Sequence, residues 1–144
     1  MQVSVLLQSK GSEVVTVGPD TTMGEAIDAL ARHRIGAVVV TGDGHTIEGV
    51  VAERDVVLSL SVLGPTVLSR PVSEVMNTDV VTCRPDTTIE HLMSTMTDRR
   101  VRHVPVTVDG HLVGLVSIGD VVKDRISGLE FEARVLHEYI SHPY

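Results

Sequence analysis

The chain has 144 residues, of which 42% are hydrophobic and only 2% aromatic, and its formal net charge is −7. These values predict one compact unit with an aliphatic core, and the acidic balance argues against a protein that binds nucleic acid or an anionic membrane. The single cysteine, Cys83, excludes an intrachain disulfide and fits a reducing compartment. Because no signal peptide or membrane-spanning apolar run is visible, we expect a cytoplasmic location.

The first predicted elements are a short strand and a helix. After an apolar lead-in at residues 3–7, residues 14–17 form a β-rich run that ends at a Gly-Pro pair. Thr22 and Glu25 form a capping box, which predicts the start of a helix. Apolar residues then follow at helical spacing, namely Met23, Ala26, Ile27, Leu30 and Ala31.

A strand pair and a second helix are predicted next. Residues 37–40 form a continuous apolar run, which suggests a strand buried on both faces. A turn at 42–44 leads to a return strand at 47–51, and a second helix is expected to start near Asp55. Residues 64–71 contain two prolines and are predicted to be a linker.

The second half of the chain repeats the first. Residues 19–22 (Pro-Asp-Thr-Thr) return as 85–88, and residues 43–45 (Asp-Gly-His) return as 109–111. Two copies can form a closed pair in which each covers the apolar face of the other. Such a pair creates a cleft with two quasi-equivalent sites.

The second copy is predicted to contain the same elements as the first. Thr87 and Glu90 are expected to form its capping box. Strands at 104–108 and 112–116 are predicted to be joined by a tight Asp-Gly turn, because type I′ turns need positive φ at both central residues. A further helix is expected to start near Asp120.

Residues 129–140 have no counterpart in the first copy. Leu129, Ala133, Leu136 and Ile140 form one apolar stripe, which predicts an additional C-terminal helix. Two interpretations remain open: the helix packs on its own module, or its stripe makes a dimer contact. The predicted division of the chain is a first unit (1–63), a linker (64–71), a second unit (72–127) and a C-terminal helix and tail (128–144).

The junction between the last strand and the last helix carries the candidate chemistry. Gly114 and Gly119 let the backbone approach a ligand, Ser117 offers a hydroxyl, and Asp120 can accept hydrogen bonds from two ribose hydroxyls. A helix that starts there directs free N–H groups at the same point, which suits a phosphate. The alternative is that Asp120 is an ordinary N-cap, and the matching Asp55 does not separate these interpretations.

A basic run precedes the proline-containing strand of the second copy. Arg99, Arg100, Arg102 and His103 form the only dense basic cluster in an acidic chain. The run is either a solvated helix end, because cations favour helix C-termini, or a phosphate clamp beside the cleft.

These stretches resemble a tandem pair of CBS (cystathionine-β-synthase) domains, a unit often called a Bateman module. The resemblance rests on residues 49–57, 114–122 and 102–106, and it covers about residues 1–127. It implies an α/β (α+β) fold of two β-α-β-β-α units related by a pseudo-twofold axis. It also implies a homodimer, since many such modules pair into discs.

The resemblance further implies an adenosyl ligand in the cleft: AMP, ADP or ATP, with S-adenosylmethionine or NAD as weaker candidates and no required cofactor. By analogy with the family, Ser117 would contact phosphate or ribose, Asp120 would hold the ribose, and Arg102 and His103 would meet phosphates. The rest of the predicted ligand-binding set is Gly114, Gly119, Val104, Pro105, Thr82, Asp55, Arg54, Thr16 and Ala37.

The first copy departs from the family pattern. Ala52 stands where the second copy has Ser117, and Arg54 replaces Gly119. We therefore expect the site that contains Ser117 and Asp120 to bind more tightly than the Asp55 site.

Two functions are predicted from these features. The first is a regulatory module that binds an adenine nucleotide and signals to an unidentified target protein. The second is a ligand-free protein-interaction or scaffold dimer. Neither enzymatic activity nor a metal site is expected, because the sequence shows no nucleophile–base pair, no paired catalytic carboxylates and no paired metal-ligand spacing.

Overall fold

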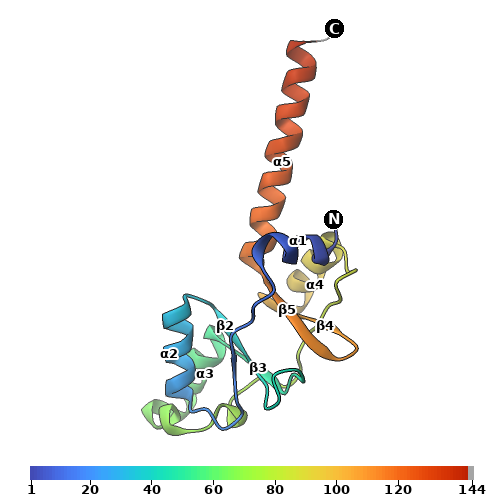
Figure 1. Cartoon of the computed structure of the whole chain (residues 1–144). Helices are drawn as coiled ribbons and strands as arrows, with labels where there is room; N and C mark the ends of the chain where they lie inside the picture. The colour runs from blue at the N-terminus through green and yellow to red at the C-terminus, as the bar shows by residue number, and fades with distance from the viewer. Residues whose placement is uncertain (143–144) are drawn as a thin grey trace.

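The computed structural model describes residues 1–142, which form two similar halves and one long projecting helix (Figure 1). The predicted duplicated α/β architecture is confirmed. The first half contains β1 (Thr16–Val17), α2 (Met23–His33), β2 (Ala37–Val40), β3 (Gly49–Ala52) and α3 (Glu53–Leu63). The second contains α4 (Ile89–Arg99), β4 (His103–Val108), β5 (His111–Ser117) and the start of α5 (Ile118–Ser141). Helix α1 (Val3–Lys10) comes first in the chain, and two 3-10 segments connect the halves, η1 (Gly64–Ser69) and η2 (Val72–Glu74).

The first half follows its predicted elements closely. The Thr22 hydroxyl accepts a hydrogen bond from the Glu25 N–H (3.2 Å), and the Glu25 carboxylate accepts one from the Thr22 N–H (3.4 Å), so the predicted capping box is confirmed. Strand β1 pairs parallel with β2, which pairs antiparallel with β3. Every residue of β2 is buried, as expected for a continuous apolar run.

The turn between β4 and β5 also forms as predicted. Asp109 (φ 51°) and Gly110 (φ 79°) both have positive φ, which the tight antiparallel connection requires. Ahead of this pair, Cys83 bridges Val106 of β4 in parallel, in the same way that β1 pairs with β2. The second sheet therefore reproduces the first with a shorter outer strand.

The predicted cap of α4 is wrong by one residue. Thr88, rather than Thr87, caps the helix, and its hydroxyl accepts a hydrogen bond from the His91 N–H (3.1 Å). Thr88 directly precedes the first helical residue, whereas the Thr87 hydroxyl accepts the Arg84 N–H in the preceding turn. Glu90 consequently does not occupy the third helical position that a box with Thr88 would need.

The two lead-in segments are exchanged between the halves. Helix α1 precedes the first half in sequence but packs on the second, where the Val3 N–H donates to the Thr87 carbonyl (2.9 Å). Reciprocally, the Val72 N–H donates to the Thr21 carbonyl of the first half (2.7 Å), and Val72 is buried there. Three residues of α1 belong to the core of the second half: Val3, Leu6 and Leu7.

A third apolar cluster joins the two halves. Val39 and Val50 of the first half belong to a cluster that also contains Leu115 of β5. A backbone hydrogen bond also crosses between the halves, from the Leu112 N–H of β5 to the His45 carbonyl of the first half (2.8 Å). These contacts hold the two sheets against each other and fix the positions of the strand ends from which α3 and α5 start.

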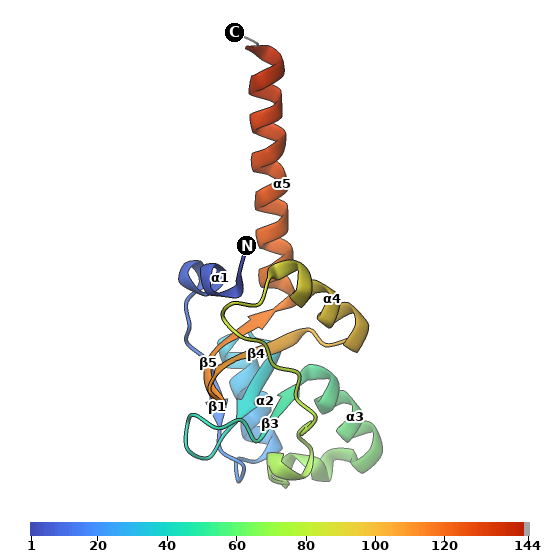
Figure 2. The same cartoon turned by 90° about the vertical axis from the view of Figure 1, so that its right-hand side faces the viewer.

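Helix α5 leaves the body after its first turns (Figures 1 and 2). Val121 is buried in the core of the second half, whereas residues 125–142 are all exposed. The interpretation that the C-terminal stripe packs on its own module is therefore wrong, because within the described residues no element covers it. The helix is continuous through residue 128, so no break marks the predicted boundary there, and residues 143–144 of the predicted tail lie outside the described residues.

Candidate functional site

Both candidate aspartates lie in the first turn of a helix that follows a strand. Asp55 and Asp120 are the third residues of α3 and α5, so neither is the N-cap. Each carboxylate folds back and accepts a hydrogen bond from the N–H of the last strand residue, Ala52 or Ser117, at 2.8 Å in both cases. The last strand residue is still extended and takes the cap position itself.

The two helix starts differ in one hydrogen bond. The Ser117 hydroxyl accepts the Asp120 N–H (3.1 Å) and completes a reciprocal capping box. Ala52 has no side-chain acceptor, so the corresponding N–H of Asp55 lacks this partner. The hydroxyl that the sequence assigned to a ligand is thus engaged in capping α5.

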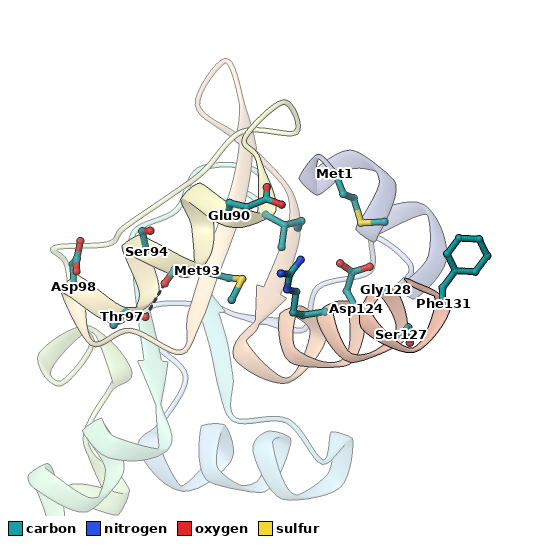
Figure 3. Close-up of a pocket in the computed structure, with 12 residues that line it drawn as sticks. Met1, Glu90, Met93, Ser94, Thr97, Asp98, Asp124, Ser127, Gly128 and Phe131 are labelled. Carbon is teal, nitrogen blue, oxygen red and sulfur yellow. Dashed lines mark hydrogen bonds between the residues drawn. The ribbon is translucent and has the colours of Figure 1, made fainter. Parts of the chain in front are cut away.

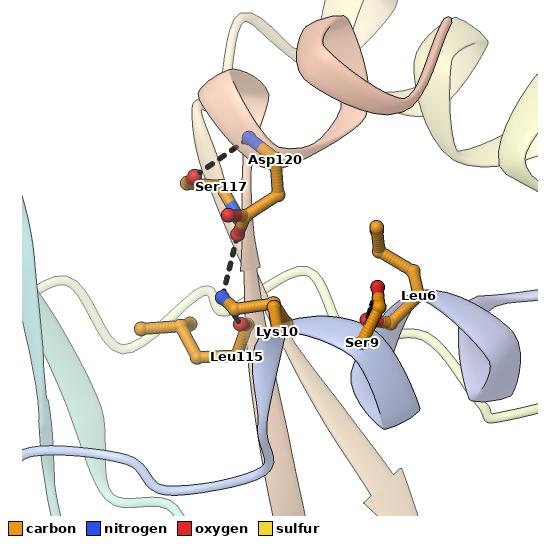
Figure 4. A network of polar contacts seen from close by, with 6 residues as sticks. All are labelled: Leu6, Ser9, Lys10, Leu115, Ser117 and Asp120. Carbon is orange, nitrogen blue, oxygen red and sulfur yellow. Dashed lines mark hydrogen bonds and ion pairs between the residues drawn. The ribbon is translucent and has the colours of Figure 1, made fainter. Parts of the chain in front are cut away.

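The carboxylate of Asp120 is also engaged by a residue from the exchanged lead-in (Figure 4). Lys10, the last residue of α1, donates from Nζ to Asp120 Oδ2 (2.5 Å) and to the Leu115 carbonyl (2.6 Å). Burial raises the pKa of Asp120, but the hydrogen bonds from Lys10 and Ser117 outweigh it and leave the pKa below its ordinary value. Asp120 is therefore a charged, paired carboxylate within the protein itself.

A cavity of about 1220 Å³ lies between the halves, beside the start of α3 and the end of α4. This volume lies somewhat above the roughly 300–1,000 Å³ that is usual for small-molecule sites, so the cavity has room for a ligand as large as a nucleotide. The cavity is lined by six residues that the sequence predicted as ligand-binding, namely Arg54, Asp55, Arg102, His103, Ser117 and Gly119.

Arginine dominates the charged wall of this cavity. Arg54 comes from α3, Arg99 and Arg100 from the end of α4, and Arg102 from the residue before β4. Arg100 adopts the left-handed conformation (φ 53°) that ends α4 and turns the basic run towards β4. We call Arg54, Arg99, Arg100 and Arg102 the arginine wall.

In the described part of the chain, three carboxylates line the same cavity as the arginine wall but form only one weak ion pair with it. Glu53, Asp55 and Asp79 also line the cavity. Arg99 pairs with Asp79 at 3.5 Å (Nη2 to Oδ2), but both side chains are more than half exposed, so this ion pair contributes little. The guanidinium groups consequently keep donors for an anion.

His103, the first residue of β4, lies against the first half of the molecule. A Cβ at Gly36 would lie 2.8 Å from the His103 ring and 3.2 Å from Glu53 Oε1, so a side chain there would displace the imidazole. Burial lowers the pKa of His103 and outweighs the carboxylates of Glu53 and Asp120, which raise it. The ring is therefore neutral at pH 7 and has one donor and one acceptor nitrogen.

The other predicted ligand residues do not line the cavity. Gly114 is covered by α1, because a Cβ there would lie 2.9 Å from Leu7 Cδ2, and the glycine accommodates a neighbouring helix. Asp120 lies at the Lys10 pair described above. The remaining five lie within or beside the strands, with Ala37, Val104 and Pro105 buried and Thr16 and Thr82 exposed.

Several cavity residues were absent from the predicted set. Arg99 and Arg100 belong to a basic run that the sequence displays plainly, so charge alone pointed to them. Residues Asn77, Asp79, Val80 and Val81 reach the cavity only because the second lead-in crosses to the first half. No motif identifies those four residues.

A separate hollow of about 830 Å³ lies between α4 and α5 (Figure 3). Met93 of α4 and Phe131 of α5 contribute apolar surface, and Asp124 and Arg125 contribute charge. None of the predicted ligand-binding residues lines it. Within residues 1–142 no group of three histidine, cysteine or carboxylate side chains is placed to hold a metal ion, and no helix there has the length and apolarity to cross a membrane.

Comparison with known proteins decides the family. Residues 10–62 and 72–126 each match the family model of the CBS domain. The chain belongs to the CBS-domain family. This tandem CBS pair is 32% identical over 150 residues to the CBS domain-containing protein CBSX3, mitochondrial, of Arabidopsis thaliana, with 99% of this chain and 73% of that protein covered.

One solved structure supports the same assignment, and a second shares the fold. The CBS-domain containing protein ATU1752 from Agrobacterium tumefaciens has a TM-score of 0.84 and 48% identity, with 87% of this chain and 99% of that chain covered. The CBS domain pair of protein MJ0100, in complex with 5′-methylthioadenosine and S-adenosyl-L-methionine, has a TM-score of 0.76, with 85% of this chain and 98% of that chain covered. At 21% identity the second likeness shows the fold alone.

Proposed function

We propose that this CBS pair is a regulatory module that binds an adenine nucleotide in the cleft between its halves. The observation that carries the proposal is the arginine wall, four guanidinium groups on one cavity in a chain whose net charge is −7. Positive charge concentrated in a cleft attracts anions, and the planar fork of arginine matches phosphate oxygens.

Asp55 is the proposed ribose-binding residue. One of its oxygens accepts the Ala52 N–H, and the carboxylate retains further lone pairs for two ribose hydroxyls. The start of α3 adds free N–H groups and a positive dipole end on the same side. The site expected to be tighter from the sequence, at Asp120, is the weaker candidate because Lys10 already occupies its carboxylate.

The apolar part of the cavity suits an adenine ring. Val80 and Val81 approach from the second lead-in, and Ile118 approaches from the start of α5. MJ0100, which shares the fold, was solved with two adenosyl compounds bound. Because the wall is cationic, we propose AMP, ADP or ATP ahead of S-adenosylmethionine, whose sulfonium is positively charged.

Such a ligand would touch both halves and would thereby connect binding to regulation. It would meet the start of α3 in the first half and the start of α5 in the second. A change in the angle between the halves would move α5 relative to the body, and a separate target protein in the cytoplasm would read that change. No catalytic step is part of the proposal. A ligand-free scaffold is the second candidate, favoured by the exposed apolar side chains of α5.

A ligand panel tests the proposal directly. We expect ATP, ADP or AMP to raise the melting temperature more than GTP or CTP, and ligand at about 100 times Kd would add roughly 2.7 kcal/mol to the free energy of unfolding. Arg102→Ala should weaken binding in calorimetric titration, whereas Arg84→Ala, an exposed arginine outside the cavity, should not. A flat response to adenine nucleotides, S-adenosylmethionine and NAD would favour the scaffold.

A further inference from the structure

The exposed length of α5 carries a regular apolar pattern. Six residues recur at alternating intervals of four and three along the helix: Val122, Ile126, Leu129, Ala133, Leu136 and Ile140. Their mean spacing is the heptad spacing of a coiled coil, in which Ile126, Ala133 and Ile140 take a positions and the others take d positions. We call these six residues the α5 seam.

The α5 seam is open to solvent along its length. Leu129 is 47% exposed, Leu136 59% and Ile140 69%. The helix stands clear of the body in both views (Figures 1 and 2). Contiguous apolar patches of this kind on soluble proteins usually mark an interaction surface.

We propose that the α5 seams of two copies of this chain pair as a parallel, two-stranded coiled coil. The residue types at the seam favour this geometry. Ile126 and Ile140 are β-branched residues at a positions, and Leu129 and Leu136 are leucines at d positions, the combination that favours parallel two-stranded coils.

The charges that flank the seam are complementary in the parallel register. Residues at g of one helix face residues at e of the next heptad in the other helix. Arg125 at g therefore faces Glu130 of the second copy, and Glu132 at g faces His137 of the second copy, which can donate to it. The symmetric pairs repeat both contacts.

The antiparallel alternatives lose either charge complementarity or apolar contact. An antiparallel pair that uses all six seam layers places Glu130 against Glu130 and Glu132 against Glu132, and like charges in these positions repel. Shifting that pair by one heptad joins Lys123 to Glu130 and Arg125 to Glu132, but retains only four of the six layers. The parallel pair keeps all six layers and the opposite charges.

This proposal concerns a different part of the molecule from the nucleotide cleft and does not depend on it. The α5 seam begins at Val122, beyond Ile118 and Gly119, the last residues of α5 that line the cavity. A parallel coil would hold two CBS pairs at the same end of a shared stalk.

A matched pair of substitutions tests the seam. Leu129 and Val135 are both 47% exposed, but Val135 lies outside the seam on another face of α5, near Phe131 and Tyr139. Sedimentation equilibrium should show a dimer for the full chain. Leu129→Glu should weaken the dimer by at least about 100-fold, because two apolar contacts are lost and two carboxylates meet. Val135→Glu should leave the dimer intact.

Charge reversal tests the parallel register. Arg125→Glu and Glu130→Lys should each weaken the dimer, and the double variant should restore it, because the two positions exchange their charges across the interface. In the shifted antiparallel register Arg125 and Glu130 do not face each other, so the double variant would not restore dimer formation.

Disulfide cross-linking gives a second test of the parallel arrangement. Under mild oxidation, Leu129→Cys should form a disulfide between copies, because the same d position recurs in one layer of a parallel coil. Ser127→Cys, at an outer position, should not. The native Cys83 does not interfere, since burial raises its pKa to about 11. A monomeric full chain, a dimer that survives Leu129→Glu, or equal disruption by Val135→Glu would each overturn the proposal.

Discussion

The first turns of α3 and α5 share one hydrogen-bond arrangement but lie in different surroundings. In each, an aspartate at the third helical position accepts the N–H of the last strand residue at 2.8 Å. At Asp120 both groups already have partners within the protein, because the Ser117 hydroxyl completes the cap and Lys10 pairs with the carboxylate. Around Asp55 neither partner is present, and the aspartate borders the cavity.

The difference shows how a duplicated fold acquires unequal sites. Lys10 belongs to α1, which crosses to the second half, whereas residues 71–79 of the other lead-in contain no lysine or arginine. Both lead-ins cross to the opposite half, but α1 is an eight-residue α-helix that ends in Lys10, whereas the second lead-in forms only the short 3-10 segment η2. A single lysine therefore separates a carboxylate that holds the protein together from one that remains open to a ligand.

The largest expected effect is on ligand affinity at the open site. Asp55→Ala removes an ionised acceptor, a class of hydrogen bond worth about 1.5–3 kcal/mol, so we expect adenine nucleotide to bind about 10- to 150-fold more weakly. Asp120→Ala should change affinity far less, because its carboxylate is engaged by Lys10. Calorimetric titration of both variants compares the two losses of affinity. A greater loss in Asp120→Ala would show that the tighter site is at Asp120, as expected from the sequence.

The next effect is on stability and concerns the missing cap. Ala52→Ser supplies an acceptor for the Asp55 N–H and should raise the free energy of unfolding by roughly 0.5–2 kcal/mol. Ser117→Ala should lower it by a similar amount, since it removes the bond to the Asp120 N–H. Urea denaturation measures both changes. If Ala52→Ser is neutral while Ser117→Ala destabilises, the first helix start does not need the cap.

Removing the Lys10–Asp120 ion pair should have a smaller effect on stability. Lys10→Ala removes a partly exposed ion pair and should cost about 0–1 kcal/mol of unfolding free energy. It also frees the Asp120 carboxylate, so we expect a second, weaker binding event in calorimetric titration. Lys123→Ala, an exposed lysine on α5, serves as the control. An unchanged stoichiometry in Lys10→Ala would show that the lysine is not what closes the site.

The smallest effect is a dependence of stability on pH at the cleft. Because burial lowers the pKa of His103 below its ordinary 6.5, the unfolded chain binds more protons than the folded one just below that pH. The stability due to the neutral ring is present above pH 6.5 and is lost as the pH falls towards the folded pKa. His103→Gln should therefore lose less stability than the parent between pH 7.5 and 5.5 in urea melts. Equal losses would assign the dependence to other groups.

The sequence by itself determined the features that rest on local patterns. The duplicated segments identified the two halves, the Thr22 box and the Asp109-Gly110 turn formed as predicted, and the basic run before β4 pointed to the arginine wall. Each depends on residues close together in the chain, whose backbone geometry is set by a few side chains. The cap of α4 was placed one residue too early. A sequence pattern does not distinguish Thr87 from Thr88, but only Thr88 directly precedes the first residue of the helix.

Only the tertiary structure decided which aspartate is open. Lys10 and Asp120 are far apart in the sequence, and they meet because the apolar face of α1 is buried on the second half rather than the first. The same exchange places Leu7 over Gly114, a glycine that the sequence assigned to a ligand. Both halves offer an apolar groove to a lead-in, so hydrophobic pattern alone cannot choose between them. The observed choice is a property of the assembled chain, because α1 completes the core around Ile89 and Leu92 and Val72 completes the core around Met23.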